Sequence, residues 1–186
     1  MRTPDAVCGC GCDCGGEAEQ VDWPEPDKGA MRFLIGSGAW MLAYGGYAVA
    51  RRRPRWFPLW LAAFVTWFTL CKYLICTRCE NYGKACDFYY LGKWAARLFP
   101  AQPGRSLDTA GTIAEGGSVA VLQFLPALAT LGSWRMFFTF TAALATNQGA
   151  QISICCRRCI RYSTDPWKRE TCPSYKLAEK LFSTKG

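Results

Sequence analysis

The sequence predicts an all-α integral membrane protein whose four transmembrane helices form two tandem helical hairpins, related by a pseudo-two-fold repeat. Three observations predict this fold. Four windows, 31–50, 56–75, 116–131 and 136–154, are nearly free of charge and are long enough, or almost long enough, to cross a hydrocarbon layer about 30 Å thick. The chain matches itself at an offset of 80 residues. Each pair of windows is followed by a cysteine module and an amphipathic segment.

The composition excludes several classes of protein. The chain has 186 residues, of which 51% are hydrophobic, and the four windows leave too few residues for a second large core. A substantial soluble enzyme domain is therefore excluded. The absence of histidine excludes Ser-His-Asp and Cys-His catalysis, and we do not expect an enzyme. Twelve cysteines make thiolate chemistry the distinctive feature of the chain.

The internal repeat pairs residues 31–82 with residues 111–162 without gaps, and eleven of these 52 positions are identical. The identities are Gly36/Gly116, Leu42/Leu122, Arg55/Arg135, Phe57/Phe137, Ala62/Ala142, Ala63/Ala143, Thr66/Thr146, Cys76/Cys156, Arg78/Arg158, Cys79/Cys159 and Tyr82/Tyr162. After a gap, Cys86 aligns with Cys172 and residues 93–99 with residues 176–182. The alternative interpretation is chance similarity.

The repeat predicts a flexible tail over 1–30, a first unit over 31–99, a linker over 100–115 and a second unit over 116–186. Because each unit crosses the membrane twice, both units start on the same side, as in parallel repeats. All cysteine modules then share one face of the membrane.

The first hairpin has interfacial anchors at Trp56 and Trp60, and residues 51–55 form an abrupt turn with four arginines. Small residues in the first helix favour close approach of a neighbouring helix. They are Gly36, Gly38, Ala39, Gly45 and Gly46.

The second hairpin is less apolar, because Pro126 interrupts its first helix and amides interrupt its second. Lipid cannot satisfy amide side chains, so we expect this polar stripe inside the bundle. Its members are Asn147, Gln148 and Gln151, together with Thr66 and Thr146.

An amphipathic helix is predicted over 88–99, where apolar residues recur at helical spacing and Lys93 and Arg97 lie on the other side. The apolar residues are Phe88, Leu91, Trp94, Ala95 and Leu98. This pattern is typical of a helix lying in the membrane surface, and 175–182 is a shorter version. The alternative is a solvated connector.

The duplicated CxxC motifs, Cys76/Cys79 and Cys156/Cys159, predict metal binding. Two thiolates at this spacing can turn toward one ion at about 2.3 Å, either in a knuckle or at i and i+3 on a helix end. The pattern suits Zn²⁺, Cu(I), another soft metal or an iron–sulfur cluster. The positive charges of the neighbouring Arg78 and Arg158 favour the thiolate form.

Two assemblies of these cysteines are open. In one, both CxxC pairs hold a single shared ion. In the other, each unit has its own site, formed by Cys76, Cys79 and Cys86 or by Cys156, Cys159 and Cys172, with a fourth ligand from elsewhere. The recurring third cysteine favours separate sites. Cys71 and Cys155 are candidate extra ligands. Buried or palmitoylated cysteines are the alternative to metal binding.

The N-terminal tail carries alternate cysteines at Cys8, Cys10, Cys12 and Cys14. Over residues 8–14 this spacing resembles the CxC runs of metallothionein-like soft-metal binders. The resemblance implies a capacity to gather Zn²⁺, Cu(I), Cd²⁺ or Hg²⁺ through thiolates.

The distribution of basic residues predicts the orientation. Sixteen Lys and Arg lie on the face that carries the N-terminus, the loop 77–117 and the C-terminal tail, against five on the other face. The cysteine modules are therefore expected in the cytoplasm, where thiols stay reduced, and the membrane is expected to be the inner or plasma membrane of a bacterium. The net charge of +8 reflects this arrangement and not a nucleic-acid partner.

These features predict a membrane-embedded, cysteine-rich protein that handles a soft metal by thiolate exchange, in transport, sequestration or sensing. The tail would collect the ion and pass it to the CxxC sites. One alternative is a membrane redox protein, working as an iron–sulfur electron relay or by thiol–disulfide exchange. Another is a scaffold subunit locked by zinc. Membrane lipid and either a membrane protein or a second copy of the chain are the expected partners.

Overall fold

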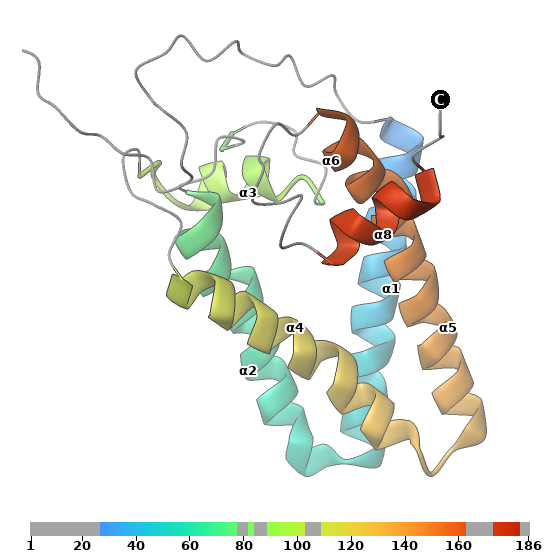
Figure 1. The fold of residues 1–186 in the computed structure, drawn as a ribbon. Helices are drawn as coiled ribbons and strands as arrows, with labels where there is room; N and C mark the ends of the chain where they lie inside the picture. The colour runs from blue at the N-terminus through green and yellow to red at the C-terminus, as the bar shows by residue number, and fades with distance from the viewer. Residues whose placement is uncertain (1–26, 78–81, 84–88, 103–108, 163–172, 183–186) are drawn as a thin grey trace, which may run out of the picture.

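The computed structural model describes residues 27–77, 82–83, 89–102, 109–162 and 173–182, and these residues are helical with short turns and no strand (Figure 1). The long helices are α1 (Lys28–Arg52), α2 (Phe57–Phe68), α4 (Thr109–Thr130) and α5 (Trp134–Ala150). The shorter elements are the 3-10 helix η1 (Pro54–Trp56), the π-helical η2 (Lys72–Cys76) and η3 (Gln151–Cys156), and the helices α3 (Leu91–Leu98), α6 (Arg157–Tyr162) and α8 (Pro173–Phe182).

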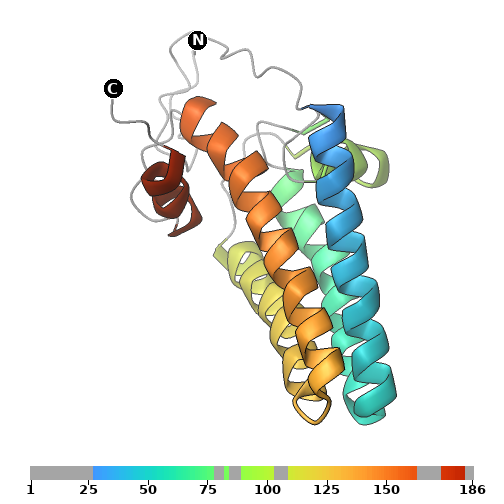
Figure 2. The same cartoon turned by 90° about the vertical axis from the view of Figure 1, so that its right-hand side faces the viewer.

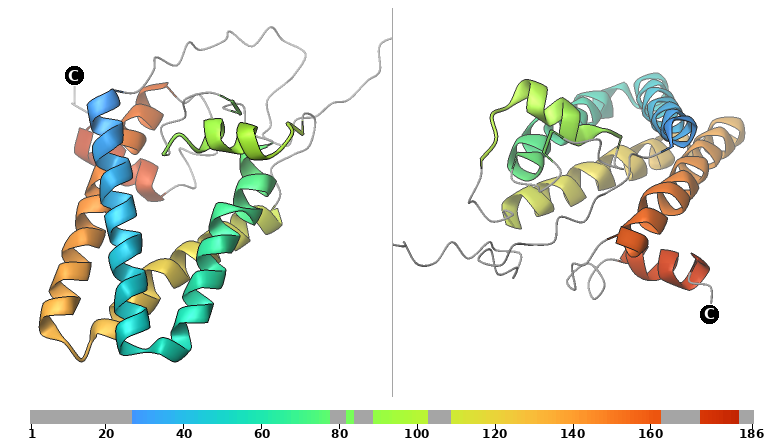
Figure 3. Two further views of the ribbon diagram at one scale, coloured as in Figure 1. Left: turned by 180° about the vertical axis from the view of Figure 1, so that it is seen from behind. Right: turned by 90° about the horizontal axis from the view of Figure 1, so that it is seen from above.

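The long helices form one bundle in which α1 and α4 occupy the middle. α4 packs on α1 and α2, and α5 packs on α1 and α4. Seen along the bundle, α2 and α5 lie at opposite sides (Figure 3). The α1–α2 and α4–α5 connections lie at one end of the bundle, and η2, α3, α6 and α8 lie at the other (Figure 2).

Three helices of the described chain are long and apolar enough to cross a membrane: Lys28–Arg52, Pro54–Cys76 and Ile113–Thr130. The all-helical, membrane-compatible character predicted from the sequence is therefore confirmed. The fourth predicted window forms α5, but α5 is not among these three. Hydroxyl and amide side chains, including Thr139, Asn147 and Gln148, interrupt its apolar sequence.

Both ends of α1 follow from local sequence. The carboxylate of Asp27 caps the first turn, where Oδ1 accepts a hydrogen bond from the backbone N–H of Ala30 at 2.7 Å. Arg51 and Arg52 in the last turn complement the helix dipole. The helix stops at Arg53 because Pro54 disfavours helical geometry in the residue before it.

Glycines in α1 permit close contact with all three other long helices. A methyl group at Gly46 would lie 2.8 Å from Cη2 of Trp60 on α2, and one at Gly45 would lie 3.1 Å from both Pro126 on α4 and Phe140 on α5. The predicted close approach is thus observed at these glycines. Gly36 differs, because no atom lies within 4 Å of the place its Cβ would take.

α4 begins at Thr109, earlier than the predicted start at 116. The additional turns are helical because they pack against the end of the second span, where a methyl group at Gly111 would lie 2.9 Å from Cβ of Leu74. Within α4, Pro126 removes one backbone donor. The hydroxyl of Thr130 donates to the carbonyl oxygens of Pro126 and Ala127, both at 2.9 Å.

The π-helical segments η2 and η3 end at Cys76 and Cys156, the first cysteine of each CxxC motif and equivalent positions at the offset of 80. π-helical turns are rare and are frequently found at functional sites. After η3 the chain continues as α6, so Cys156 and Cys159 stand at i and i+3 on a helix end.

Helices α3 and α8 lie across the same end of the bundle (Figure 3). α3 begins at Leu91, later than the predicted start at 88, because Tyr89 and Tyr90 have left-handed φ angles of 54° and 56°. Each helix buries one apolar side and leaves large apolar side chains exposed on the other. The buried residues are Leu91, Ala95, Tyr175 and Ala178, and the exposed ones are Trp94, Leu98, Leu177 and Leu181.

The close contact at Gly46 predicts that Gly46→Ala destabilises the protein by about 1–3 kcal/mol, because the added methyl group overlaps the buried Trp60 ring. Gly36→Ala in the same helix is the matched control. It meets no neighbour, and alanine favours the helix, so its stability should be unchanged or raised by up to about 1 kcal/mol. Denaturant unfolding in detergent measures both, and equal effects of the two substitutions would contradict the packing.

Candidate functional site

The described cysteines all lie near one end of the bundle. Cys71 is fully buried near the end of the second span, and Cys76, Cys155, Cys156 and Cys159 are half-buried. The other predicted ligands lie outside the described residues, as does Arg78: they are Cys8, Cys10, Cys12, Cys14, Cys79, Cys86 and Cys172. Among the described residues, no three Cys, Asp or Glu side chains gather in a way that could hold a metal ion.

The two groups of described cysteines belong to different corners of the bundle. Cys76 ends η2, which packs on α3 and α4, whereas Cys156 and Cys159 belong to η3 and α6, which pack on α8. Cys155 lies against an apolar cluster that includes Met31 and Leu34 of α1. The candidate extra ligands Cys71 and Cys155 thus both have a place in the packing of the bundle.

α8 is held beside the second cysteine group by its own contacts. It packs on η3 and α6, and the guanidinium of Arg157 lies 5.4 Å from the centre of the Phe182 ring. This cation–π contact ties the last turn of α8 to the start of α6. The neighbouring Arg158, the predicted support for the thiolates, lies between Cys156 and Cys159 in the sequence.

An ion pair between a buried lysine and a partly exposed glutamate lies next to the first cysteine group. Nζ of Lys72 is 2.6 Å from Oε1 of Glu115, and 4.8 Å from the centre of the Trp67 ring. The Lys72 side chain is 5% exposed and the Glu115 side chain 28%. A charged side chain inside an apolar segment is costly unless it has a partner of opposite charge. Such side chains commonly mark functional positions. The pair fixes the end of the second span against α4.

A polar network lies beside the second cysteine group, centred on Asn147. Its Oδ1 accepts hydrogen bonds from the Ser37 hydroxyl at 3.2 Å and from the Tyr89 hydroxyl at 2.9 Å. Nε2 of Gln151 donates to the Tyr89 oxygen at 2.6 Å. Asn147 is therefore buried, as the sequence predicted, and Gln151 is half-buried. Thr146 is exposed, contrary to the prediction. It precedes Asn147 by one position and therefore points about 100° away from it round the helix.

Tyr89 combines backbone strain with burial. A left-handed φ costs a residue with a side chain about 1–3 kcal/mol, and the hydrogen bonds to Asn147 and from Gln151 hold Tyr89 in this conformation. Burial raises the pKa of the Tyr89 phenol above its ordinary value, and the hydrogen bond donated by Gln151 opposes the rise. The phenol therefore stays neutral over a wide pH range.

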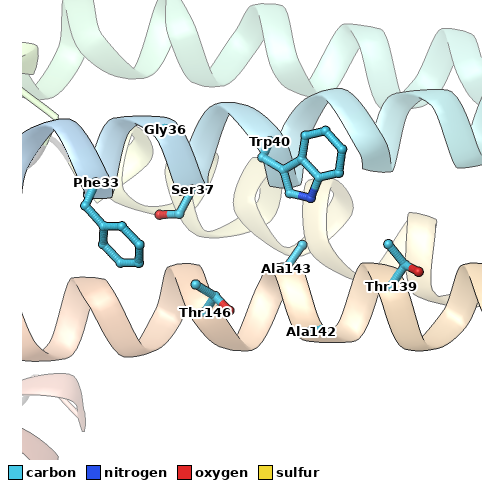
Figure 4. A pocket seen from close by; sticks show the side chains of 8 residues that line it. All are labelled: Phe33, Gly36, Ser37, Trp40, Thr139, Ala142, Ala143 and Thr146. Carbon is cyan, nitrogen blue, oxygen red and sulfur yellow. The ribbon is translucent and has the colours of Figure 1, made fainter.

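An apolar groove with a volume of about 630 Å³ runs between α1 and α5. Figure 4 shows Phe33 and Trp40 on α1 opposite Thr146 and Ala143 on α5. The groove faces outward, since Phe33 and Trp40 are 56% and 59% exposed. The remaining lining residues are Gly36, Ser37, Thr139 and Ala142. Its chemistry suits apolar contacts, because the Ser37 hydroxyl is already engaged with Leu34 and Asn147.

Sequence reasoning missed Glu115 and Tyr89 and left Lys72 without a role. Lys72 is the only charged residue in the window 56–75, which is a usable signal for a buried pair. Glu115 fell in the predicted linker, so its partner could not be assigned. Tyr89 gave no signal, because neither its backbone conformation nor its distance to Asn147 is encoded in a local pattern.

Comparison of the chain with family models, with curated proteins and with solved structures finds no match.

The ion pair predicts unequal costs for removing its two members. Glu115→Gln leaves the Lys72 ammonium buried without its carboxylate and should cost about 3–5 kcal/mol. Lys72→Met should cost less, because the carboxylate of Glu115 reaches solvent. The double variant should be more stable than Glu115→Gln alone. Unfolding free energies in detergent test this, and additive single effects would contradict it.

The raised pKa of Tyr89 predicts a loss of stability in alkali. The folded state holds the phenolic proton more tightly than the unfolded state, in which it titrates near pH 10.0. The contribution of this phenol to the free energy of unfolding is therefore fully present below pH 10. It is lost as the pH rises through 10 toward the folded pKa. Tyr89→Phe should lose stability less steeply above pH 10 than the wild type. Identical slopes for the two proteins would exclude this role of Tyr89.

Proposed function

We propose that the protein is an integral membrane protein with four membrane-crossing helices that binds a soft metal through cysteines at one end of its bundle. The observation that carries the proposal is the placement of Cys76 and Cys156, the first cysteine of each CxxC motif. Each of these cysteines is the last residue of a π-helical segment, η2 or η3. Both segments lie at the same end of the bundle (Figure 2).

The fourth crossing is proposed for α5 because it continues through η3 and α6 as a helix from Trp134 to Tyr162. Its buried polar residue, Asn147, is satisfied by Ser37 and Tyr89 and need not face lipid. Its outward face carries large apolar side chains, including Trp134 and Phe138.

A repeat of two hairpins is supported by how the helices pair. The second helix of each hairpin packs against the first helix of the other, since α2 lies on α4 and α5 lies on α1, while α1 and α4 contact each other. A pseudo-two-fold axis between α1 and α4 would relate these contacts. α2 and α5 are then placed at opposite sides, which separates Cys76 from Cys156 and Cys159.

This separation favours two metal sites, one for each unit, over one shared ion. Each would draw on its own CxxC pair and its own third cysteine, Cys86 or Cys172. The exposed faces of α3 and α8, with Trp94 and Leu98 on one and Leu177 and Leu181 on the other, support helices lying in the membrane surface next to the sites. The N-terminal cysteines would deliver the ion, and the basic residues at this end favour a cytoplasmic location.

Metal content tests the proposal and the number of sites. The full-length protein, purified without oxygen, should contain bound metal by elemental analysis. Cys76→Ser/Cys79→Ser and Cys156→Ser/Cys159→Ser should each remove about half of the metal if the sites are separate, and nearly all of it if one ion is shared. Cys71→Ser, at a buried candidate ligand outside both motifs, tests whether Cys71 supplies a fourth ligand, in which case part of the metal is lost.

The same preparation distinguishes the alternatives. Colourless protein with stoichiometric zinc that survives replacement of the four N-terminal cysteines by serine would indicate a structural site. Brown protein would indicate an iron–sulfur cluster. Metal-free protein whose CxxC cysteines titrate between two thiols and none would indicate thiol–disulfide exchange and would overturn metal binding.

A further inference from the structure

The end of the bundle opposite the cysteines carries a concentrated positive surface. The α1–α2 connection contributes Arg51, Arg52, Arg53 and Arg55, and the start of α5 contributes Arg135; all five are exposed. The two connections touch, because a methyl group at Gly132 would lie 2.8 Å from Nη2 of Arg52. Arginines far apart in the sequence thus form one surface, which we call the arginine end.

This surface has no compensating carboxylate in the surrounding bundle. Residues 28–77 and 109–162 contain a single acidic residue, Glu115. That residue is at the opposite end of the bundle and is engaged with Lys72. The guanidinium of Arg53 contacts an aromatic ring, since it lies 5.5 Å from the centre of the Trp56 ring. Five clustered like charges repel one another, and an anionic partner relieves this repulsion.

The position of the arginine end indicates which anion it meets. The candidate spans Lys28–Arg52 and Pro54–Cys76 meet at these arginines, and Ile113–Thr130 ends beside Gly132. Trp134 is 75% exposed and Trp56 is 36% exposed, so both connections carry an indole at the level of the charges. Tryptophan at the ends of spans marks the membrane–water interface, where the lipid headgroups lie.

We propose that the arginine end binds the phosphates of anionic phospholipid headgroups in the adjacent leaflet. The planar guanidinium matches phosphate with two parallel hydrogen bonds, which the ammonium of lysine does not. Trp56 and Trp134 would hold the connections at headgroup depth. The surface is independent of the cysteines and of metal binding.

Lipid titration of the full-length protein tests this proposal. The protein is stripped of lipid in a neutral maltoside detergent and titrated with short-chain phosphatidylglycerol or phosphatidylcholine, with bound lipid counted by native mass spectrometry. Phosphatidylglycerol should bind more tightly. Arg51→Gln/Arg53→Gln/Arg55→Gln should weaken its binding about tenfold or more, since each basic residue near an anionic surface contributes about fivefold. Arg52 is kept because it packs on Gly132.

The matched control removes three positive charges from the other end of the bundle. Arg97→Gln/Lys176→Gln/Lys180→Gln changes exposed side chains of α3 and α8 and should weaken phosphatidylglycerol binding less than the substitutions at the arginine end. Equal affinity of the wild type for the two lipids, or an equal loss in the control, would overturn the proposal. So would tighter binding of a single-stranded oligonucleotide than of phosphatidylglycerol.

A second variant applies if the glutamine variant does not fold. Arg51→Lys/Arg53→Lys/Arg55→Lys keeps every charge and removes the paired hydrogen bonds. The proposal requires weaker phosphatidylglycerol binding in this variant, with unchanged unfolding. Unchanged lipid affinity would overturn it.

Discussion

The bundle depends on close contact between α1 and its three long neighbours, which glycine makes feasible. Gly46 admits the Trp60 ring of α2, and Gly45 admits Pro126 of α4 and Phe140 of α5. Lipid is as apolar as the helix surfaces, so helices in a membrane associate through packing and hydrogen bonds more than through the hydrophobic effect. Small residues therefore determine which helices meet. α1 can pack against three helices at once because Gly46 faces α2, whereas Gly45 faces α4 and α5.

Two buried polar contacts then fix the cysteine end of this bundle. The Lys72–Glu115 pair holds the second span against α4, and the Asn147 network joins α1, α5 and the strained segment at Tyr89. Each lies next to one group of cysteines. Because buried polar groups lose much of their stabilisation when geometry changes, both contacts hold their helices in a defined register. Because the helices that carry them are held in place, the two cysteine groups have defined positions at separate corners of the bundle.

The two ends of the bundle have different chemistry. One carries the described thiols, the helices α3 and α8 and the polar contacts. The other carries two short connections with five exposed arginines and two partly exposed tryptophans. A metal site, as proposed for the first end, requires fixed side chains and deprotonated thiols. Lipid phosphate contacts, as proposed for the second, require only exposed charge at the correct depth.

The sequence by itself determined the helical, membrane-compatible character and the polar turn at 51–55, because charge-free length and clustered arginine are local properties. It also placed Asn147, Gly45 and Gly46 inside, since amides and small residues in apolar helices have few other uses, whereas Gly36 is exposed. Only the tertiary structure decided that Lys72 pairs with Glu115, that Tyr89 reaches Asn147, that Thr146 faces outward, and that α2 and α5 stand apart. These facts depend on helix rotation and on contacts between residues distant in the chain, which no local spacing contains.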